Sequence, residues 1–454
     1  MKSFRKVIAT TALVVVGSMS VATMASAESI SGSGATFPQT FQAAATVEYT
    51  KGSGHTVTYA NPGGGSGKGK TDFFSNLTDF GGSDSAVSST QSGSTAFPWV
   101  YVPYVAGGIS VAYRLDEIKG STLNLSIPTV AGIFDGTIKM WNDPAIVADM
   151  KANAIWANST KKSAYKGASA LWTPTSTTAS TLTVTLTPAA LKAAKGKKIE
   201  ILEDKKSVKT VTVAAKGQIA IALTTKEATY TVKVDGKEVA KYALATPTLP
   251  AKAITVVYRS DGSGTTNNFI KPLNAFSTKW TVNDSFTTAI PGGSTAVAGF
   301  GAAFQGQSGS ANVSNAIADT NGSIGYTEVS FVTDATRAAK GMASANIKNA
   351  AGKYVAPTAA AVSSMVADSD IDAKGFVTFN FKQTTNTAAY PFIAVTYAIA
   401  KTAVSSKSIV VSDYLKWILT TYAPAAAESL GYAPLTGAIL TVAKNNAARI
   451  GSGN

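Results

Sequence analysis

Hydrophobic and polar residues alternate with a period of two through the middle of the chain. Five short segments rich in Thr and Val show this pattern, at residues 182–186, 198–202, 208–213, 218–223 and 229–234. Such alternation is typical of strands with one buried face. Asp235 and Gly236 follow the last segment and favour a two-residue hairpin turn. The pattern predicts a small antiparallel β-sandwich over residues 157–250.

A mixed pattern flanks this block on both sides. Strands are expected at residues 56–59, 100–104, 109–113 and 253–258, and helices at 37–49, 265–280, 411–422 and 435–450. Alternation of strands and helices is typical of an α/β protein. The segment from Thr246 to Pro250 contains two prolines and marks the end of the β-only block. The sequence therefore predicts an α/β protein with an inserted all-β sandwich module.

The first residues have the composition of a secretory signal peptide. Lys2, Arg5 and Lys6 precede an apolar run at residues 7–16, and a small-residue cleavage site stands at 25–27. A membrane anchor is the alternative, but the run is shorter than the roughly 20 apolar residues of a spanning helix. The chain has no cysteine, so we expect no disulfide and no lipid-bearing cysteine after the signal. We predict a signal peptide over residues 1–27 and an exported protein, periplasmic or extracellular, that is soluble after cleavage.

Positive charge is concentrated in the predicted β module. The formal net charge of the chain is +14, and residues 157–250 contain 15 lysines against 6 acidic residues. The rest of the mature chain is close to neutral, so nucleic acid is not an expected partner. The lysines favour contact with an anionic cell-wall or membrane surface, with a solvated spacer domain as the alternative.

Two segments rich in Gly, Ser and Thr stand where a strand is expected to turn into a helix. They are residues 31–38 and residues 259–266, which begin with Arg259. A helix N-terminus presents unpaired N–H groups and partial positive charge, and therefore suits an oxyanion. Hydroxyl groups add donors, and the guanidinium of Arg259 matches a tetrahedral oxyanion in a bidentate manner. Together the two segments predict an anion-binding site.

Catalytic alternatives have weaker support. Residues 64–71 fit the nucleotide-binding pattern G-x-x-x-x-G-K-[ST], but no strand ending in a matching acid follows. His55 is the one histidine and is expected in a solvated turn, which disfavours a Ser-His-Asp triad or a zinc site. Five aromatic residues could stack on a sugar, although aromatic residues in strands are more often part of a core; they are Trp99, Tyr101, Tyr104, Trp141 and Tyr326. We therefore predict no catalytic residue, no metal and no cofactor.

Five motifs give the chain a resemblance to a known family. Residues 32–38, 79–84, 131–144, 259–266 and 322–326 together resemble the phosphate-binding proteins of high-affinity phosphate ABC transporters. The resemblance covers most of 28–155 and 251–454, and not the β module. It implies a two-lobed periplasmic-binding-protein (Venus flytrap) fold that binds inorganic phosphate between the lobes and delivers it to an ABC permease. Lobe 1 would comprise 28–110 and 328–454, and lobe 2 would comprise 111–156 and 251–327.

The resemblance also implies the ligand residues. The donors and the acidic acceptor would be Thr36, the backbone N–H of Phe37, Ser66, Asp84, Arg259, Ser263, Gly264 and Thr265. Asp261 would orient Arg259. A carboxylate such as Asp84 favours a ligand that carries a proton, as phosphate does and sulfate does not; a turn or helix-capping aspartate is the alternative. Two other functions stay open, a cell-surface adhesion or scaffold protein and the recognition part of an extracellular phosphatase.

Overall fold

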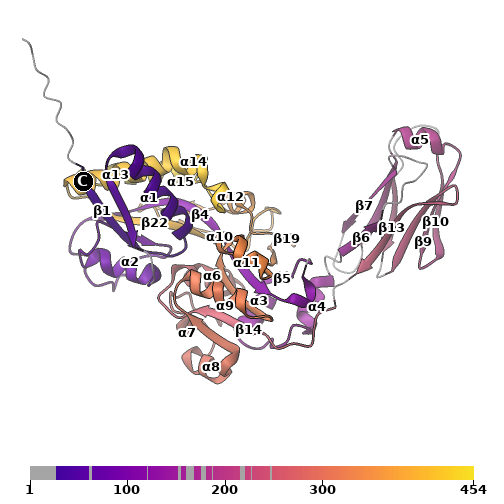
Figure 1. Ribbon diagram of the computed structural model, residues 1–454, viewed down its shortest axis with the longest axis horizontal. Coiled ribbons are helices and arrows are strands. Elements are labelled where there is room, and N and C mark those ends of the chain that lie inside the picture. Colours follow the sequence, from indigo (N-terminus) through magenta and orange to yellow (C-terminus); the bar gives the residue numbers. More distant parts are fainter. Residues whose placement is uncertain are drawn as a thin grey trace, which may run out of the picture.

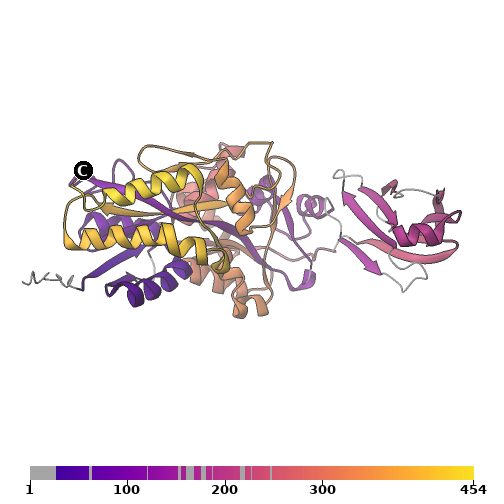
Figure 2. The same cartoon turned by 90° about the horizontal axis from the view of Figure 1, so that it is seen from above.

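The computed structural model describes residues 27–60, 64–119, 121–151, 155–159, 168–174, 180–186, 188–214, 220–225, 228–245 and 248–453. These residues form an α/β body and a β-rich part that is set apart from it beyond helix α4, Pro144–Lys151 (Figures 1 and 2). The predicted signal peptide lies outside the described residues except for Ala27.

A ten-stranded mixed sheet runs through the body. Its order is β15-β14-β16-β4-β22-β3-β1-β2, and β17 and β23 both pair with β4. The strands are β1 (Ser29–Gly34), β2 (Thr56–Ala60), β3 (Phe80–Ser83), β4 (Trp99–Arg114), β14 (Thr255–Arg259), β15 (Phe304–Gln307), β16 (Ser323–Glu328), β17 (Met342–Ser344), β22 (Ile393–Lys401) and β23 (Tyr432–Ala433).

Strand β4 joins the two lobes, and it corrects one sequence prediction. Two strands were expected at 100–104 and 109–113, yet β4 is continuous, pairing with β22 through its first ten residues and with β16 through its last six. Gly107 and Gly108, which lie between the two predicted strands, allow neighbouring groups to pack closely against β4. A Cβ on Gly107 would lie 2.8 Å from the ring of Phe37, so glycine there allows close contact and does not mark a turn.

Helices cover both faces of the sheet. The longer ones are α1 (Gln39–Ser53), α2 (Gly65–Phe74), α3 (Ile127–Phe134), α6 (Gly264–Phe276), α8 (Gly293–Phe300), α9 (Ser310–Asp319), α12 (Ala359–Ala367), α13 (Ser406–Trp417) and α15 (Gly437–Arg449). The helix predicted at 411–422 is α13 followed by a π-helical turn, Ile418–Tyr422. The other three predicted helices are present with ends shifted by a few residues, and none of the described helices is long and apolar enough to cross a membrane.

The β-rich part forms two antiparallel sheets with a hydrophobic cluster of their own. One sheet has the order β10-β9-β12-β13-β6 and the other β11-β8-β7. The strands are β6 (Ile155–Ser159), β7 (Ala168–Pro174), β8 (Ser180–Leu186), β9 (Lys198–Glu203), β10 (Lys206–Thr212), β11 (Ala220–Thr225), β12 (Thr229–Val234) and β13 (Lys237–Ala245), with helix α5 (Pro188–Ala194). All five predicted strands are present. Asp235 and Gly236 both have positive φ, 52° and 72°, as a type I′ hairpin requires.

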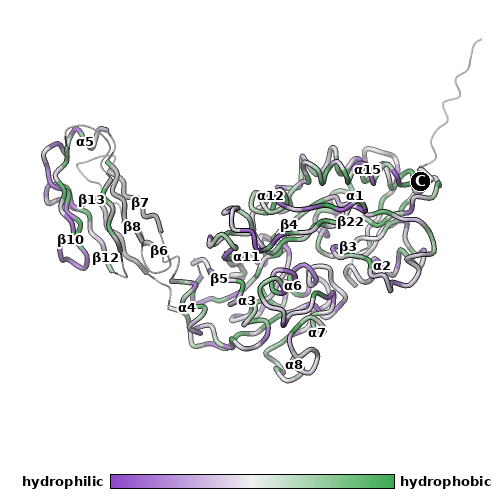
Figure 3. Tube along the Cα trace, turned by 180° about the vertical axis from the view of Figure 1, so that it is seen from behind, coloured by the Kyte–Doolittle hydropathy of each residue, from purple (hydrophilic) through white to green (hydrophobic). Residues whose placement is uncertain are grey.

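The hydrophobic cluster of the β-rich part is separate from the two clusters of the body. The larger cluster in the body runs from Ile30 to Ile450 and includes no residue of β6–β13, whereas Ile199, Ile201 and Val232 belong to the cluster in the β-rich part. Figure 3 shows hydrophilic colouring along the outer strand β10. The bounds of 157–250 for an inserted module, and those of the lobes, stay predictions.

Candidate functional site

Four helix N-termini meet where the two lobes touch. Thr36 and Phe37 precede α1, Ser66 lies in the first turn of α2, Ser263 caps α6, and Ser310 begins α9. The hydroxyl oxygens of Thr36 and Ser310 are 3.0 Å apart. Because a helix N-terminus carries partial positive charge and unpaired N–H groups, a place where four of them lie together favours an anion.

Asp84, which directly follows β3, supplies a buried acid. Its side chain is held from two directions: the Ser66 hydroxyl lies 3.2 Å from Oδ2, and the Thr396 hydroxyl donates to Oδ1 at 2.8 Å. Its backbone N–H donates to Ser66 Oγ at 3.0 Å. Burial raises the pKa of Asp84 to about 7, an effect that the Thr396 hydrogen bond opposes and the nearby Glu328 charge increases. Near neutral pH this carboxyl can therefore accept a proton or a hydrogen bond.

Arg259 supplies a buried cation. The end of β14 places it with 2 % of its surface exposed. Its Nε and Nη2 donate to the two carboxylate oxygens of Asp261 at 2.7 and 2.6 Å, and its Nη1 donates to Ser310 Oγ at 3.1 Å. The backbone N–H of Gly309 also donates to Asp261, at 3.0 Å. Asp261 thus holds the guanidinium by its Nε–Nη2 edge, and Nη1 is directed at Ser310, where the helix N-termini lie together.

Two glycines allow the lobes to approach closely. A Cβ on Gly264 would lie 2.3 Å from Ser66 Oγ and 2.7 Å from Asp84 Cβ. A Cβ on Gly65 would lie 2.7 Å from Arg259 Nη2, and Gly65 has φ of +56°. Neither position can take a side chain without displacing a group of the site.

The hydroxyls at the start of α6 complete the set predicted from the sequence. Ser263 Oγ accepts from the backbone N–H of Thr266 at 3.1 Å, which caps the helix and leaves the hydroxyl proton for another acceptor. The Thr265 hydroxyl donates to Glu328 Oε1 at 3.2 Å. The buried Phe37 is held through its carbonyl, which accepts from the Tyr432 hydroxyl at 2.7 Å. The structure thus brings all eight residues and Asp261 to one region, and their role as ligands stays a prediction.

Sequence reasoning missed three polar residues here. Ser310, Glu328 and Thr396 are buried, and each hydrogen-bonds a predicted site residue. A signal existed for Ser310, because residues 307–310 form a third Gly/Ser segment between a strand and a helix. Glu328 ends β16 two residues after the motif at 322–326, whereas Thr396 lies in an unbroken hydrophobic strand that gives no such signal. We call Thr36, Asp84, Arg259, Ser310 and Glu328 the inner cluster.

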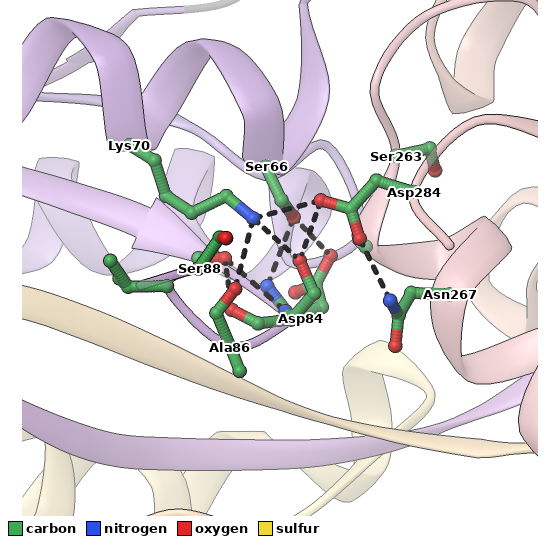
Figure 4. A network of polar contacts seen from close by, with 12 residues as sticks. Ser66, Lys70, Asp84, Ala86, Ser88, Ser263, Asn267 and Asp284 are labelled. Carbon is green, nitrogen blue, oxygen red and sulfur yellow. Dashed lines mark hydrogen bonds and ion pairs between the residues drawn. The ribbon is translucent and has the colours of Figure 1, made fainter. Parts of the chain in front are cut away.

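A second polar group links the lobes at the edge of the site. Lys70 of α2 donates to Asp284 Oδ2 at 2.8 Å and to Ser85 Oγ at 3.0 Å (Figure 4). Asp284 also accepts from Ser85 at 2.9 Å and from Asn267 at 2.9 Å. We call Lys70, Ser85, Asn267 and Asp284 the rim cluster. Lys68, the other lysine of the segment at 64–71, pairs with Asp72 of its own helix at 2.6 Å.

Within the described residues, no three His, Cys, Asp or Glu side chains are grouped so that they could hold a metal ion.

Fold and site together define a two-lobed binding protein with a buried polar cluster between its lobes. A family model described as the PBP superfamily domain matches residues 20–246 and 215–421. The chain belongs to the PBP superfamily.

Several proteins share part of the sequence. The chain is 40% identical over 124 residues to the phosphate-binding protein PstS of Haemophilus influenzae, which covers 27% of this chain and 36% of that protein. It is 44% identical over 105 residues to the phosphate-binding protein PstS 2 of Mycobacterium tuberculosis, covering 21% and 26%. These matches span about a third or less of the relatives' length.

Solved structures share the fold over most of the chain. A high affinity periplasmic phosphate-binding protein, PfluDING, bound with phosphate, has a TM-score of 0.57 at 19% identity and covers 92% of this chain and 93% of its own. A DING protein has a TM-score of 0.55 at 19% identity and covers 92% of both chains. At this level of identity the likeness establishes the two-lobed fold alone.

Proposed function

We propose that the chain is an exported solute-binding protein that captures inorganic phosphate between its lobes and delivers it to an ABC permease, without catalysis. One observation carries the proposal: a buried polar cluster combines Arg259 and four helix N-termini with an acid, Asp84. The PstS relatives and the phosphate-bound structural neighbour support phosphate as the ligand. The basic and apolar start of the chain supports export.

The donor set suits a tetrahedral oxyanion. A dry site can hold such an ion only if its oxygens are covered by hydrogen bonds. The hydroxyls of Thr36 and Ser263, N–H groups of the helix starts and the Arg259 guanidinium can supply these bonds, and Ser66 can add its hydroxyl once it turns away from Asp84 Oδ2.

Asp84 provides the selection between oxyanions. An ionised carboxylate repels an anion unless the anion donates a proton to it. Monohydrogen phosphate carries such a proton at neutral pH, and sulfate carries none. Asp84 therefore favours phosphate and penalises sulfate, which would leave two anionic oxygens opposed in a buried site.

Ligand binding is expected to close the lobes. Thr36 and Asp84 lie on lobe 1, whereas Arg259 and Ser263 lie on lobe 2, so one phosphate would contact both. The contacts between Lys70 and Asp284 can form only when the lobes meet. Phosphate then shifts a hinge equilibrium toward the closed form.

We also infer that the lysine-rich part at 157–250 lies against an anionic wall or membrane surface. Lys198, Lys206 and Lys209 are exposed on β9 and β10. Attraction of this kind acts over a Debye length of about 8–10 Å and weakens with salt.

Calorimetric titration of the mature protein with phosphate, sulfate and arsenate tests the ligand. We expect phosphate and arsenate to bind and sulfate to be rejected, and Asp84→Asn to reduce that rejection because an amide can donate to a fully deprotonated oxyanion. Asp413→Asn is the matched control, since Asp413 is an exposed aspartate that pairs with Lys416 on α13. A wild-type protein that binds sulfate as well as phosphate would falsify the role of Asp84.

A further inference from the structure

Glu328 is a second buried acid of the inner cluster, and its carboxylate accepts hydrogen bonds from three hydroxyl groups. It ends β16 with 1 % of its surface exposed. Oε1 accepts from the Ser310 hydroxyl at 2.8 Å and from the Thr265 hydroxyl at 3.2 Å, and Oε2 accepts from the Thr327 hydroxyl at 3.1 Å. The hydroxyl proton of Thr265, which is predicted to donate a hydrogen bond to phosphate, is thus directed at Glu328.

Ser310 connects Glu328 to the rest of the site. Its oxygen accepts from Arg259 Nη1 at 3.1 Å and lies 3.0 Å from the Thr36 hydroxyl. A hydroxyl has one proton and cannot donate to Glu328 and to a bound anion at once. Thr265 and Ser310 can therefore donate their hydroxyl protons to a phosphate only if their hydrogen bonds to Glu328 are broken.

Charge balance opposes an ionised Glu328 beside a bound anion. The groups that face it from neighbouring elements are Arg259 of β14, Asp84 after β3 and Tyr432 of β23. Arg259 is already paired with Asp261, and Tyr432 stays neutral because burial raises its pKa far above the normal range. A divalent anion would thus add to the charges of Asp84 and Glu328 in a buried space, and burial already raises the pKa of Glu328 to about 7.

We propose that Glu328 takes up one proton from solvent when phosphate binds, so that its carboxyl group donates to Ser310 and leaves the Ser310 and Thr265 hydroxyls free to donate to the ligand. This inference rests on the proposed function. It makes Glu328 a positioning residue that acts through two hydroxyls and couples phosphate affinity to pH.

Asp84 is the other acid that could take the proton, and its contacts disfavour it. Asp84 must stay ionised to accept the proton of the phosphate. Asp84 would give up the Ser66 hydroxyl at Oδ2, but the Thr396 hydroxyl donates to Oδ1 from β22. Thr396 is not one of the predicted ligands, so this stabilising bond can persist when phosphate binds. Glu328 Oε1, by contrast, would lose both of its donors.

Proton uptake is measurable by calorimetry in buffers that differ in ionisation enthalpy. We would titrate phosphate into mature wild-type protein and into Glu328→Gln at pH 8 and at pH 5.5. The ionisation of phosphate itself is common to both proteins and cancels in the difference. At pH 8 the wild type should take up between about half a proton and one proton more than the variant. At pH 5.5 the difference should vanish, because a carboxyl with a raised pKa is protonated before phosphate arrives.

The outcomes separate the inference from the proposed function. Absence of binding heat in every buffer would reject phosphate as the ligand. Phosphate binding with equal proton uptake in wild type and Glu328→Gln at pH 8 would overturn the role of Glu328, and so would uptake that disappears in Asp84→Asn but not in Glu328→Gln.

Infrared difference spectroscopy of the wild type provides a test that does not depend on folding of the variant. A protonated carboxyl band should appear when phosphate is added at pH 8. Its absence would overturn the inference.

Discussion

The inner and rim clusters both join the lobes, but they differ in charge and in hydrogen bonding. In the rim cluster one cation meets one carboxylate, and the side chain of Asp284 accepts from three partners, Lys70, Ser85 and Asn267. In the inner cluster Arg259 is committed to Asp261, while the carboxyl groups of Asp84 and Glu328 are held by hydroxyls. The rim is locally neutral, and the inner cluster has an excess of acid.

This difference assigns the two clusters different tasks. Hydroxyls can turn and exchange donor for acceptor roles, so the inner cluster can be rearranged by a ligand. The ion pair of the rim, Lys70 with Asp284, does not contact the ligand in this proposal. A ligand affects it only through the closure that brings the two side chains together. Substitutions in the inner cluster should therefore change which anion binds and how tightly, and substitutions in the rim should change how long the lobes stay closed.

Arg259→Ala should have the largest effect. Loss of a charge-assisted contact in a dry site costs about 2–5 kcal/mol, which corresponds to a loss of roughly 30-fold or more in phosphate affinity. Calorimetric titration measures this, with thermal melting to confirm folding. Arg449→Ala, which removes an exposed arginine of α15, is the control. Binding by Arg259→Ala within about threefold of wild type would remove Arg259 from the site.

Lys70→Met should have an intermediate effect. Lys70 and Asp284 have side-chain exposures of 8% and 22%, so the pair is partly shielded and contributes only in the closed form. We expect phosphate affinity to fall about tenfold, mainly through faster release. Stopped-flow release rates measure this effect.

Closure itself can be measured on the wild type. Small-angle scattering should show a smaller radius of gyration with phosphate than without it.

Lys68→Met is the matched control for the rim. Lys68 lies on the same helix, but it pairs with Asp72 within its lobe, so release should stay at the wild-type rate. Equal release rates for the two lysine variants would mean that the rim pair does not stabilise closure. An unchanged radius of gyration with phosphate would argue against a closing hinge.

Local patterns predicted the fold, and tertiary packing limited the prediction of the site. The segments around Thr36 and Arg259 were found because a strand, a Gly/Ser turn and a helix follow one another in sequence. Thr396 was missed because it is one polar residue in a strand buried on both faces. The two halves of β4 were separated in the prediction because Gly107 resembles a turn, whereas its lack of a side chain accommodates Phe37. Contacts between lobes, such as that of Lys70 with Asp284, involve partners more than 200 positions apart and leave no local pattern.

The smallest effect on phosphate binding is expected from removal of the lysine-rich β part. Its hydrophobic cluster is separate from those of the body. The chain segments on either side of it lie together, since the backbone N–H of Trp141 donates to the carbonyl of Lys252 at 2.9 Å and that of Ile254 donates to Lys139 at 2.9 Å. A short linker can therefore replace residues 155–245 without separating the strands of the body.

Deletion of 155–245 should leave phosphate affinity within about twofold of wild type, because distant groups with no shared contacts act independently. The same deletion should abolish retention on cell-wall fragments or anionic vesicles at low salt, since the excess lysines lie in the removed segment. Calorimetry and co-sedimentation at low and high salt measure the two effects. If the shortened protein sediments as well as the full chain, the segment is a spacer. If its phosphate affinity falls as far as that of Arg259→Ala, the β part contributes to the site, and recognition is not confined to the inner and rim clusters.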